Sequence, residues 1–251
     1  MGTVSQLPQF SSDISVELVS AEGGDWLIAD AARVSSRHGE GAGKREATEA
    51  DSGLIRALIT GRHGGPFGHG GLTFYVEAPI FVFREWRTHR VYMNQTTDDF
   101  SYSEASARYR EVKPKFWIPE RHRLIKKAEP YKAMRPQFAE ASADDFNRLL
   151  WVMEQTYIDA WKAYSAALAD GIAPEVARAL LPVSLYSAMY VSCNPRSLLH
   201  FLSLRVASAD SLIPTYPQLE IQKAAEQMEA IFAERWPVTY RHWVANGRVS
   251  V

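Results

Sequence analysis

The feature that most constrains the fold is a long amphipathic stretch, residues 144–171, which reads "DDFNRLLWVMEQTYIDAWKAYSAALADG". Its apolar residues recur at helical spacing, and Gly171 is a typical helix stop. Such a long helix has to cover its apolar face with other parts of the chain. The whole chain of 251 residues is long enough to supply a sizeable core for it.

Shorter elements surround this helix. The segment 72–83 is rich in aromatic and β-branched residues and begins as a strand, and Pro79 then fits the first turn of a helix that runs through Arg90. Further strands are expected at 15–21 and 184–193, and further helices at 26–36, 49–65, 173–182, 194–208 and 216–237. Strands lie between helices without strict βαβ alternation, which predicts an α+β fold.

Composition narrows the class of protein. Lys and Arg number 28 against 29 Asp and Glu, so the net charge is −1 and any basic site is local. This balance argues against a nucleic-acid-binding module. Cys193 is the single cysteine, which favours a reducing, cytoplasmic compartment. The sequence has no signal peptide and no apolar run long enough for a membrane span, so no membrane partner is expected.

A glycine-rich segment, "GRHGGPFGHGG" at 61–71, is one candidate site. Its backbone N–H groups are able to approach a phosphate, although no P-loop pattern is present. The alternative is a simple turn between a helix and a strand. His63 and His69 lack the Cys/His cluster that a metal site needs, so no metal is predicted.

The segment 84–110, "REWRTHRVYMNQTTDDFSYSEASARYR", is a second candidate site. Arginine forks suit phosphate oxygens. Strand alternation in its last part puts Tyr102, Glu104 and Ser106 on one face with Arg108, which is an arrangement that suits a phosphorylated, hydroxylated small molecule. A solvated charged surface is the alternative, and the interleaved aromatic residues argue against it.

Two arginines further along the chain are candidates as well. Arg178 alone reads as an exposed helix arginine. At about 100° per residue from Leu198, Arg205 falls at about −20°, in the centre of the apolar stripe of its helix. A buried arginine has to be paired, either with an internal carboxylate or with an anionic ligand. Arg196 and His200 lie on the opposite face of the same helix, at i and i+4.

Together these motifs resemble the flavin-dependent thymidylate synthases from about Gly53 to Trp236. The resemblance rests on "APIFVFREWRTHR", "SYSEASARYR", "ARALLPVSLY", "NPRSLLHFLSLR" and "QLEIQ", which occur in the family's order. It implies a single family-like domain over 1–251, with a loose tail at 1–13 and a central mixed or antiparallel sheet flanked by long helices. It also implies a homotetramer whose active sites are shared between subunits.

The family binds FAD, takes a methylene group from methylenetetrahydrofolate and uses flavin reduced by NADPH to build a methyl group on C5 of dUMP. By position, the resemblance implies nucleotide contacts from Glu85, Trp86, Arg87, Thr88, Glu104, Ser106, Ala107, Arg108, Arg178 and Arg205. It implies flavin contacts from His63, Thr88, His89, Arg90, Glu104, Asn194, Arg196 and His200, with His63 also near folate. Arg205 corresponds to the catalytic cation that polarises the uracil ring, which agrees with its place in an apolar stripe.

Some positions depart from the family pattern. Thr88 replaces an arginine, and Gly65 and Gly68 stand where the family usually has Ser/Thr and Glu. About eight residues are inserted between Arg90 and Ser101, within the segment 91–99. The insertion includes Asn94, Gln95, Thr96 and Thr97, whose side chains are able to bond an extra 2′-hydroxyl.

Three readings follow from these departures. The chain is a dUMP and UMP C5-methylase, a specialised UMP methylase of nucleoside antibiotic biosynthesis, or a homologue that binds nucleotide without catalysis. None of them needs a cysteine nucleophile, and Cys193 reads as packing at a strand end.

Overall fold

Strand β3 (Gly71–Pro79) shows how the sequence pattern becomes structure in the computed structural model, which describes residues 7–34, 43, 45–88, 100–129 and 136–251. Leu72, Phe74, Val76 and Ala78 are buried, and the residues between them are half-buried. This is the period of two expected for a strand with one face on a core. Helix α3 (Ile80–Trp86) follows β3 directly, as predicted.

The main sheet has four strands in the order β2 (Ser15–Glu22), β3, β8 (Tyr186–Cys193) and β4 (Phe100–Glu104). It is antiparallel, and helices accompany it, so the predicted α+β class is confirmed. Two short pairs lie outside it: β1 (Gln9–Ser11) is parallel to β5 (Lys115–Trp117), and β6 (Lys126–Lys127) is antiparallel to β7 (Phe138–Ala139).

The expected loose tail over 1–13 is wrong at β1. Phe10 lies opposite Phe116 in the β1–β5 pair and its ring lies 6.4 Å from that of Tyr157, so this short segment is held by backbone pairing and by an aromatic contact. Both constraints come from residues far along the chain and leave no local signal.

The chain forms two compact units, and strands β3, β8 and β4 contribute residues to both. One unit comprises Met1–Asp13, Glu77–Arg84 and Glu104–Ala188; the other comprises Ile14–Val76, Glu85–Ser103 and Met189–Val251.

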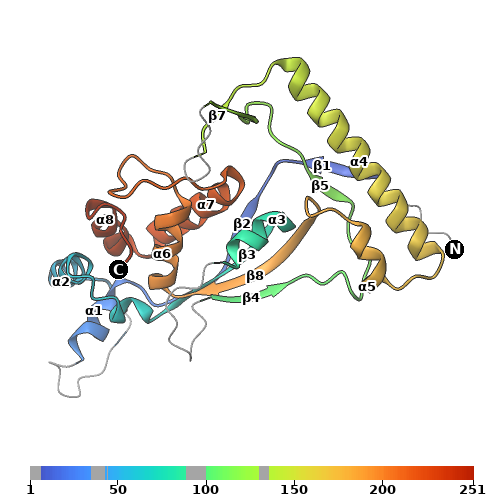
Figure 1. The fold of residues 1–251 in the computed structure, drawn as a ribbon. Coiled ribbons are helices and arrows are strands. Elements are labelled where there is room, and N and C mark those ends of the chain that lie inside the picture. Colours follow the sequence, from blue (N-terminus) through green and yellow to red (C-terminus); the bar gives the residue numbers. More distant parts are fainter. Residues whose placement is uncertain (1–6, 35–42, 44, 89–99, 130–135) are drawn as a thin grey trace. The chain divides into compact units, whose positions relative to one another are not determined.

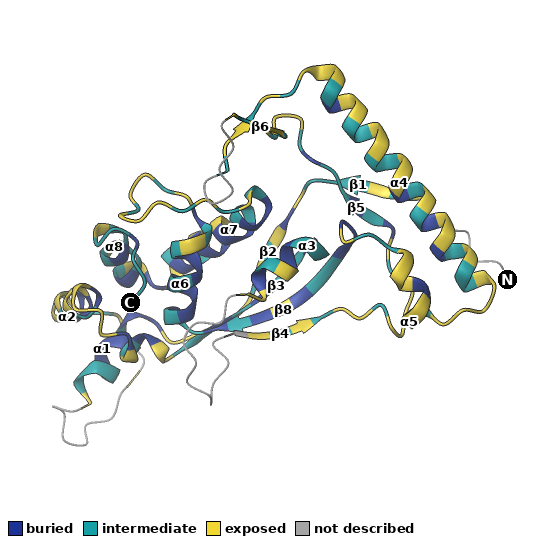
Figure 2. Cartoon of the chain, viewed as in Figure 1, coloured by how far each residue is buried: buried dark blue, intermediate teal, exposed yellow. Residues whose placement is uncertain are grey.

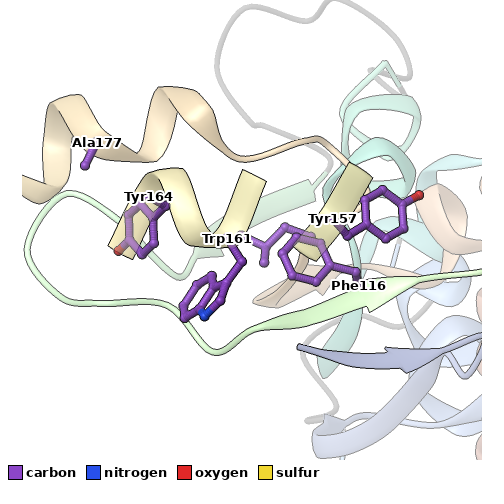
Figure 3. Close-up of a cluster of buried hydrophobic side chains, with 6 residues drawn as sticks. Phe116, Tyr157, Trp161, Tyr164 and Ala177 are labelled. Carbon is purple, nitrogen blue, oxygen red and sulfur yellow. The ribbon is translucent and has the colours of Figure 1, made fainter. Parts of the chain in front are cut away.

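The first unit is built around helix α4 (Ala143–Ala169). Ser142 caps its start by accepting from the Asp145 N–H, and Gly171 ends it with a positive φ of 79°. Its apolar face packs into the cluster drawn in Figure 3, which contains Phe116, Tyr157, Trp161, Tyr164, Ala177 and Leu185. Phe116 and Tyr157 stack with ring centroids 5.1 Å apart. The other face of α4 is exposed along its length (Figure 2).

Two short helical turns complete this unit beside α4. Helix α5 (Pro174–Ala177) is followed by a 3-10 turn, η2 (Arg178–Leu180), and both pack against α4.

The second unit contains the remaining helices (Figure 1): α1 (Asp25–Arg33), α2 (Glu49–Thr60), α6 (Pro195–Arg205), α7 (Leu219–Arg235) and α8 (Pro237–Ala245). Helix α7 packs against α6, α8 and β2, and α2 packs against α1 and α8. Helix α6 follows β8 after a single capping residue, Asn194, which is the predicted start.

Several boundaries differ from those the sequence predicts. The helix expected over 49–65 ends at Thr60, and the helix expected over 173–182 is divided into α5 and η2. Helix α3 ends at Trp86, because Thr88 turns the chain by donating to the carbonyl of Glu85. The strand expected through Arg108 ends at Glu104, so Ser106 and Arg108 are not in strand register with Tyr102. Helix α8 was not predicted separately from the helix before it; Pro237, which begins it, had been read as the end of a single helix.

Candidate active site

The predicted site residues that the structure describes fall into three groups, at the end of α3, beside α5, and at the start of α6. His89, Arg90 and the insertion 91–99 lie outside the described residues. Each group is built from residues of one compact unit.

Arg205 and Glu85 form the first group. Nη1 of Arg205 lies 2.6 Å from Oε1 of Glu85, and the two side chains are 20% and 24% exposed. Arg205 is the last residue of α6, and Glu85 is the penultimate residue of α3. The expectation of a fully buried Arg205 is therefore revised. Its guanidinium lies at the end of the apolar stripe, where it is partly accessible to solvent and has a protein carboxylate as its partner.

Trp86 anchors this group. Its indole is fully buried and stacks on the ring of Phe201, with centroids 4.9 Å apart and planes 22° from parallel. Phe201 lies one helical turn before Arg205, so the stack fixes the end of α3 next to the end of α6. The Trp86 ring has a packing role in this arrangement, and the nucleotide contact expected from Trp86 stays a prediction.

Glu220 adds a second carboxylate to the group. It lies in the first turn of α7, which packs against α6, and it is 3% exposed. Burial raises the pKa of Glu85, the Arg205 guanidinium opposes that rise, and the negative charge of Glu220 adds to it. The Glu85 carboxyl is thus acted on by one guanidinium and by one further carboxylate.

Thr88 occupies the position where the family resemblance expects an arginine. Its hydroxyl donates to the Glu85 carbonyl at 2.7 Å, and its N–H donates to the same oxygen at 3.2 Å. Both bonds satisfy the end of α3. Thr88 and Arg87 are exposed, so both are accessible to a ligand.

The second group surrounds Glu175 of α5. The Nε–H of Arg108 donates to its Oε2 at 2.5 Å, and the Nε–H of Arg178 donates to its backbone carbonyl at 3.2 Å. Two arginines from separate motifs therefore meet at one short helix. Both are exposed, which leaves guanidinium N–H groups directed to solvent and able to bind an anion.

The segment before Arg108 forms the turn that presents it. The Ser106 hydroxyl accepts from the Arg108 N–H at 3.2 Å, and the Ala105 N–H donates to the Ala188 carbonyl at 2.8 Å. Glu104 and Ala107 are half-buried on either side of the exposed Ser106.

The third group is at the start of α6. The Asn194 side chain accepts from the Ser197 N–H at 2.8 Å, as a helix cap. The Nε–H of Arg196 donates to the Val251 carbonyl at 3.4 Å, and Nδ1 of His200 lies 3.2 Å from the hydroxyl of Ser250. The i, i+4 pair predicted from the sequence therefore faces a segment from the end of the sequence.

The glycine-rich segment contributes close packing to this group. A β-carbon on Gly64 would lie 2.7 Å from Nε of Arg196, so only glycine permits this approach. Gly65 and Gly68, in contrast, have open space where a β-carbon would be, and neither has a positive φ. His63 is exposed beside this turn. At Gly65 and Gly68, the backbone conformation therefore does not require glycine, and a larger side chain would have space at the surface.

A pocket of about 340 Å³ opens next to Asn194. Each strand of the main sheet contributes one hydroxyl residue to it, in the strand order of the sheet: Ser20, Thr73, Ser192 and Ser101. The Thr73 and Ser192 hydroxyls are 2.9 Å apart, and Glu22, Gly70 and Gly71 complete the wall. Such a surface suits a hydroxylated or phosphorylated ligand.

Cys193 is buried, and burial raises the pKa of its thiol far above the ordinary value. A thiol of this kind is a poor nucleophile at neutral pH.

Within the described residues, His, Cys, Asp and Glu side chains form no group of three or more that could hold a metal ion. In the same part of the chain, no helix has the length and apolar character needed to cross a membrane.

The sequence analysis did not identify Glu175, Glu220 or the hydroxyl row, which consists of Ser20, Thr73, Ser192 and Ser101. Glu175 precedes Arg178 by one helical turn, which is a weak local signal. The other positions become neighbours only when strands and helices pack, so nothing in the local sequence marks them.

Comparison with known proteins adds independent findings. The family model described as "Thymidylate synthase complementing protein" matches residues 17–238. A flavin-dependent thymidylate synthase of Streptomyces avermitilis is 43% identical over 245 residues, which is 97% of this chain and 96% of that protein. One from Tropheryma whipplei is 40% identical over 246 residues, 97% of each chain.

Solved structures agree with these relatives. The UMP/dUMP methylase PolB from Streptomyces cacaoi bound with 5-Br UMP superposes with a TM-score of 0.84 at 39% identity, covering 98% of this chain and 100% of that one. The same protein bound with 5-Br dUMP gives a TM-score of 0.86 at 40% identity, covering 97% and 100%.

Proposed function

The chain belongs to the thymidylate synthase complementing protein family, the flavin-dependent thymidylate synthases, and on that premise we propose that it methylates C5 of a uridine monophosphate. The methylene carbon comes from methylenetetrahydrofolate, and the resulting methyl group replaces the hydrogen on C5. FAD, when bound and reduced by NADPH, supplies the hydride. The substrates are dUMP, UMP or both, in line with the compounds bound to the structural relative.

The observation that carries this proposal is the place of Arg205. Uracil C5 becomes nucleophilic when negative charge on the ring is stabilised, and a fixed, partly desolvated cation does this well. Arg205 is held at the end of α6, one fifth exposed, with a carboxylate partner 2.6 Å away. A cation so placed is able to exchange its protein partner for an anionic ring.

A second anion-binding element is the pair of arginines at α5. Arg108 and Arg178 both contact Glu175 and both have N–H groups facing solvent. On the basis of the family resemblance, we assign these two arginines to the phosphate or ribose of the nucleotide. We assign Arg87, Thr88, Glu104, Ser106 and Ala107 to the same nucleotide.

The start of α6 supports a flavin site. Arg196 offers a guanidinium that is positioned by close contact with Gly64, and the hydroxyl-lined pocket lies beside Asn194. Those donors fit the phosphate and hydroxyl groups of a dinucleotide. We assign Asn194, Arg196, His200 and His63 to this cofactor, together with His89 and Arg90. Cys193 takes no part in the chemistry.

We also propose that residues 1–251 act as one catalytic domain in a homotetramer in the cytoplasm. Trp151, on the outward face of α4, is 63% exposed and neighbours the exposed Val152, which is unusual for a helix that faces only water. Trp151→Glu should lower the oligomeric mass measured by light scattering without unfolding the chain. An unchanged mass would remove α4 from the assembly surface.

The decisive experiment is a methylation assay with dUMP and UMP side by side, each with methylenetetrahydrofolate, FAD and NADPH. Methylated product from either nucleotide is expected, and the purified protein should show the absorption spectrum of bound flavin. Product from neither nucleotide, in a protein that binds nucleotide, would leave the non-catalytic homologue as the better reading.

A specialised UMP methylase is the second candidate. It is favoured by the insertion at 91–99 in this sequence, whereas the structural relative is bound with 5-Br UMP in one structure and with 5-Br dUMP in the other. Deletion of residues 92–99 should reduce the preference between UMP and dUMP in the same assay. Equal rates for the two nucleotides in both the intact and the shortened enzyme would exclude a role in discrimination.

A further inference from the structure

The arginine that is assigned to the nucleotide already has an anionic partner in the free protein. Oε1 of Glu85 lies 2.6 Å from Nη1 of Arg205, which is the geometry of a charge-assisted hydrogen bond. The uracil ring of a nucleotide that approaches Arg205 must therefore compete with Glu85.

Glu85 is held in this position by its neighbours. The Trp86 ring next to it is fully buried against Phe201, and Phe201 precedes Arg205 by one turn of α6. On the other side, Thr88 fixes the Glu85 carbonyl with two hydrogen bonds. These contacts hold the Glu85 backbone in place, so its carboxylate points toward Arg205.

Glu220 makes the balance of charge unfavourable for a further anion. It is almost fully buried in the first turn of α7, and its negative charge acts on Glu85. The charged groups that act on the Glu85 carboxyl are Arg205 from α6 and Glu220 from α7, and together the three groups carry one excess negative charge when both acids are ionised. Negative charge that develops on a uracil ring at Arg205 would add to this excess.

We propose that Glu85 is a positioning residue that holds Arg205 in the free protein and yields it to the bound nucleotide. The inference rests on the proposed function. The carboxylate gives up the guanidinium either by losing its contact or by accepting a proton, and the uracil ring of the nucleotide takes its place. Glu220 makes this release easier, because its repulsion disfavours a charged Glu85.

The exchange predicts a defined dependence on pH. Burial and Glu220 place the Glu85 pKa above that of an ordinary glutamate, despite the opposing effect of Arg205. Above that pKa, Glu85 is charged and competes for Arg205. As the pH falls through it, Glu85 becomes neutral and the competition disappears, so the nucleotide affinity of the wild type should approach that of a variant without this charge.

The test is calorimetric titration of the flavin-loaded protein with dUMP and with UMP across this pH range. E85Q keeps the shape of the side chain and removes its charge, so it should bind nucleotide about tenfold more tightly than wild type at neutral pH. The difference in nucleotide affinity between E85Q and wild type should become smaller as the pH falls. Protonation of the nucleotide phosphate affects both proteins equally and cancels in the comparison.

E220Q gives a second, independent readout. Removal of the repelling charge lowers the Glu85 pKa, so the pH at which wild type and E85Q converge should move down when both are compared in the E220Q background. E226Q is the matched control: Glu226 lies on the exposed face of the same helix and should leave the affinity and its pH dependence unchanged.

Two results would overturn the proposal in different ways. Equal or weaker nucleotide binding by a folded E85Q, with normal binding by wild type, would contradict the exchange and leave the proposed function intact. The pH profile of nucleotide binding by E220Q alone can be compared with that of wild type even if E85Q does not fold, and identical profiles would also contradict the exchange. No binding of either nucleotide by wild type would overturn the proposed function and the inference together.

Discussion

The guanidinium of Arg196 lies against the backbone of Gly64, so closely that a β-carbon at Gly64 would be 2.7 Å from Nε and 2.9 Å from Cζ. This contact connects the glycine-rich segment with the first turn of α6, and it explains why a glycine is required at that point. Gly64 has an ordinary helical backbone, so space alone is decisive.

Gly64→Ala should therefore displace Arg196. We expect a loss of about 1–3 kcal/mol in the free energy of unfolding, because Arg196 has to leave its hydrogen bond with the Val251 carbonyl to make room for the new β-carbon. Flavin retained after gel filtration should fall as well. Gly65→Ala is the matched control, because no atom lies within 4 Å of its new β-carbon. Equal effects of the two substitutions would contradict a specific role for the Arg196 contact.

Arg205→Ala should affect catalysis more than folding. It removes the cation that faces the uracil ring, and we expect kcat to fall by at least about a hundredfold. Steady-state assays with dUMP and UMP give kcat, and circular dichroism checks the fold. Arg84→Ala, at an exposed position of α3, is the control and should keep full activity. An Arg205→Ala enzyme with wild-type kcat would exclude Arg205 from the chemical step.

Cys193→Ala should retain activity. The thiol is buried, and its raised pKa keeps it protonated at neutral pH, so it cannot serve as a nucleophile. The methylation assay measures this directly, with flavin absorbance as the check on cofactor content. Complete loss of activity with flavin still bound would show that the reaction is covalent at Cys193.

Phe116→Ala should destabilise the unit that contains α4. Phe116 is fully buried and stacks on Tyr157, so its removal leaves a cavity that costs about 3–5 kcal/mol. Urea unfolding monitored by tryptophan fluorescence is suited to this measurement. Leu124→Ala, at a partly exposed loop position, should change stability by less than about 0.5 kcal/mol. A small effect at Phe116 would place the core of this unit elsewhere.

Much of the secondary structure could be predicted because its signals are local. Ser142 and Gly171 delimit α4, and Asn194 and Pro195 begin α6, since capping depends on a few adjacent residues. Strand β3 was evident from its aromatic and β-branched residues. The strand β1 was missed, because three residues have too little pattern of their own and depend on pairing with β5.

The site was predictable only in part. Motif order identified the residues, including Arg108, Arg178 and Arg205, but no spacing in the chain indicated that Arg108 and Arg178 would share Glu175. The hydroxyl row was invisible for the same reason: its four members lie on four different strands and become neighbours only through strand order.

The amino-acid sequence by itself determined the helix that carries Arg205, the apolar stripe in which this arginine lies, and the need for an anionic partner, because helical periodicity and the cost of burying a charge are local properties. Only the tertiary structure decided that the partner is Glu85 and that Glu220 lies behind it. Those choices depend on how the end of α3, the end of α6 and the start of α7 pack, and packing is set by contacts between residues far apart in the chain.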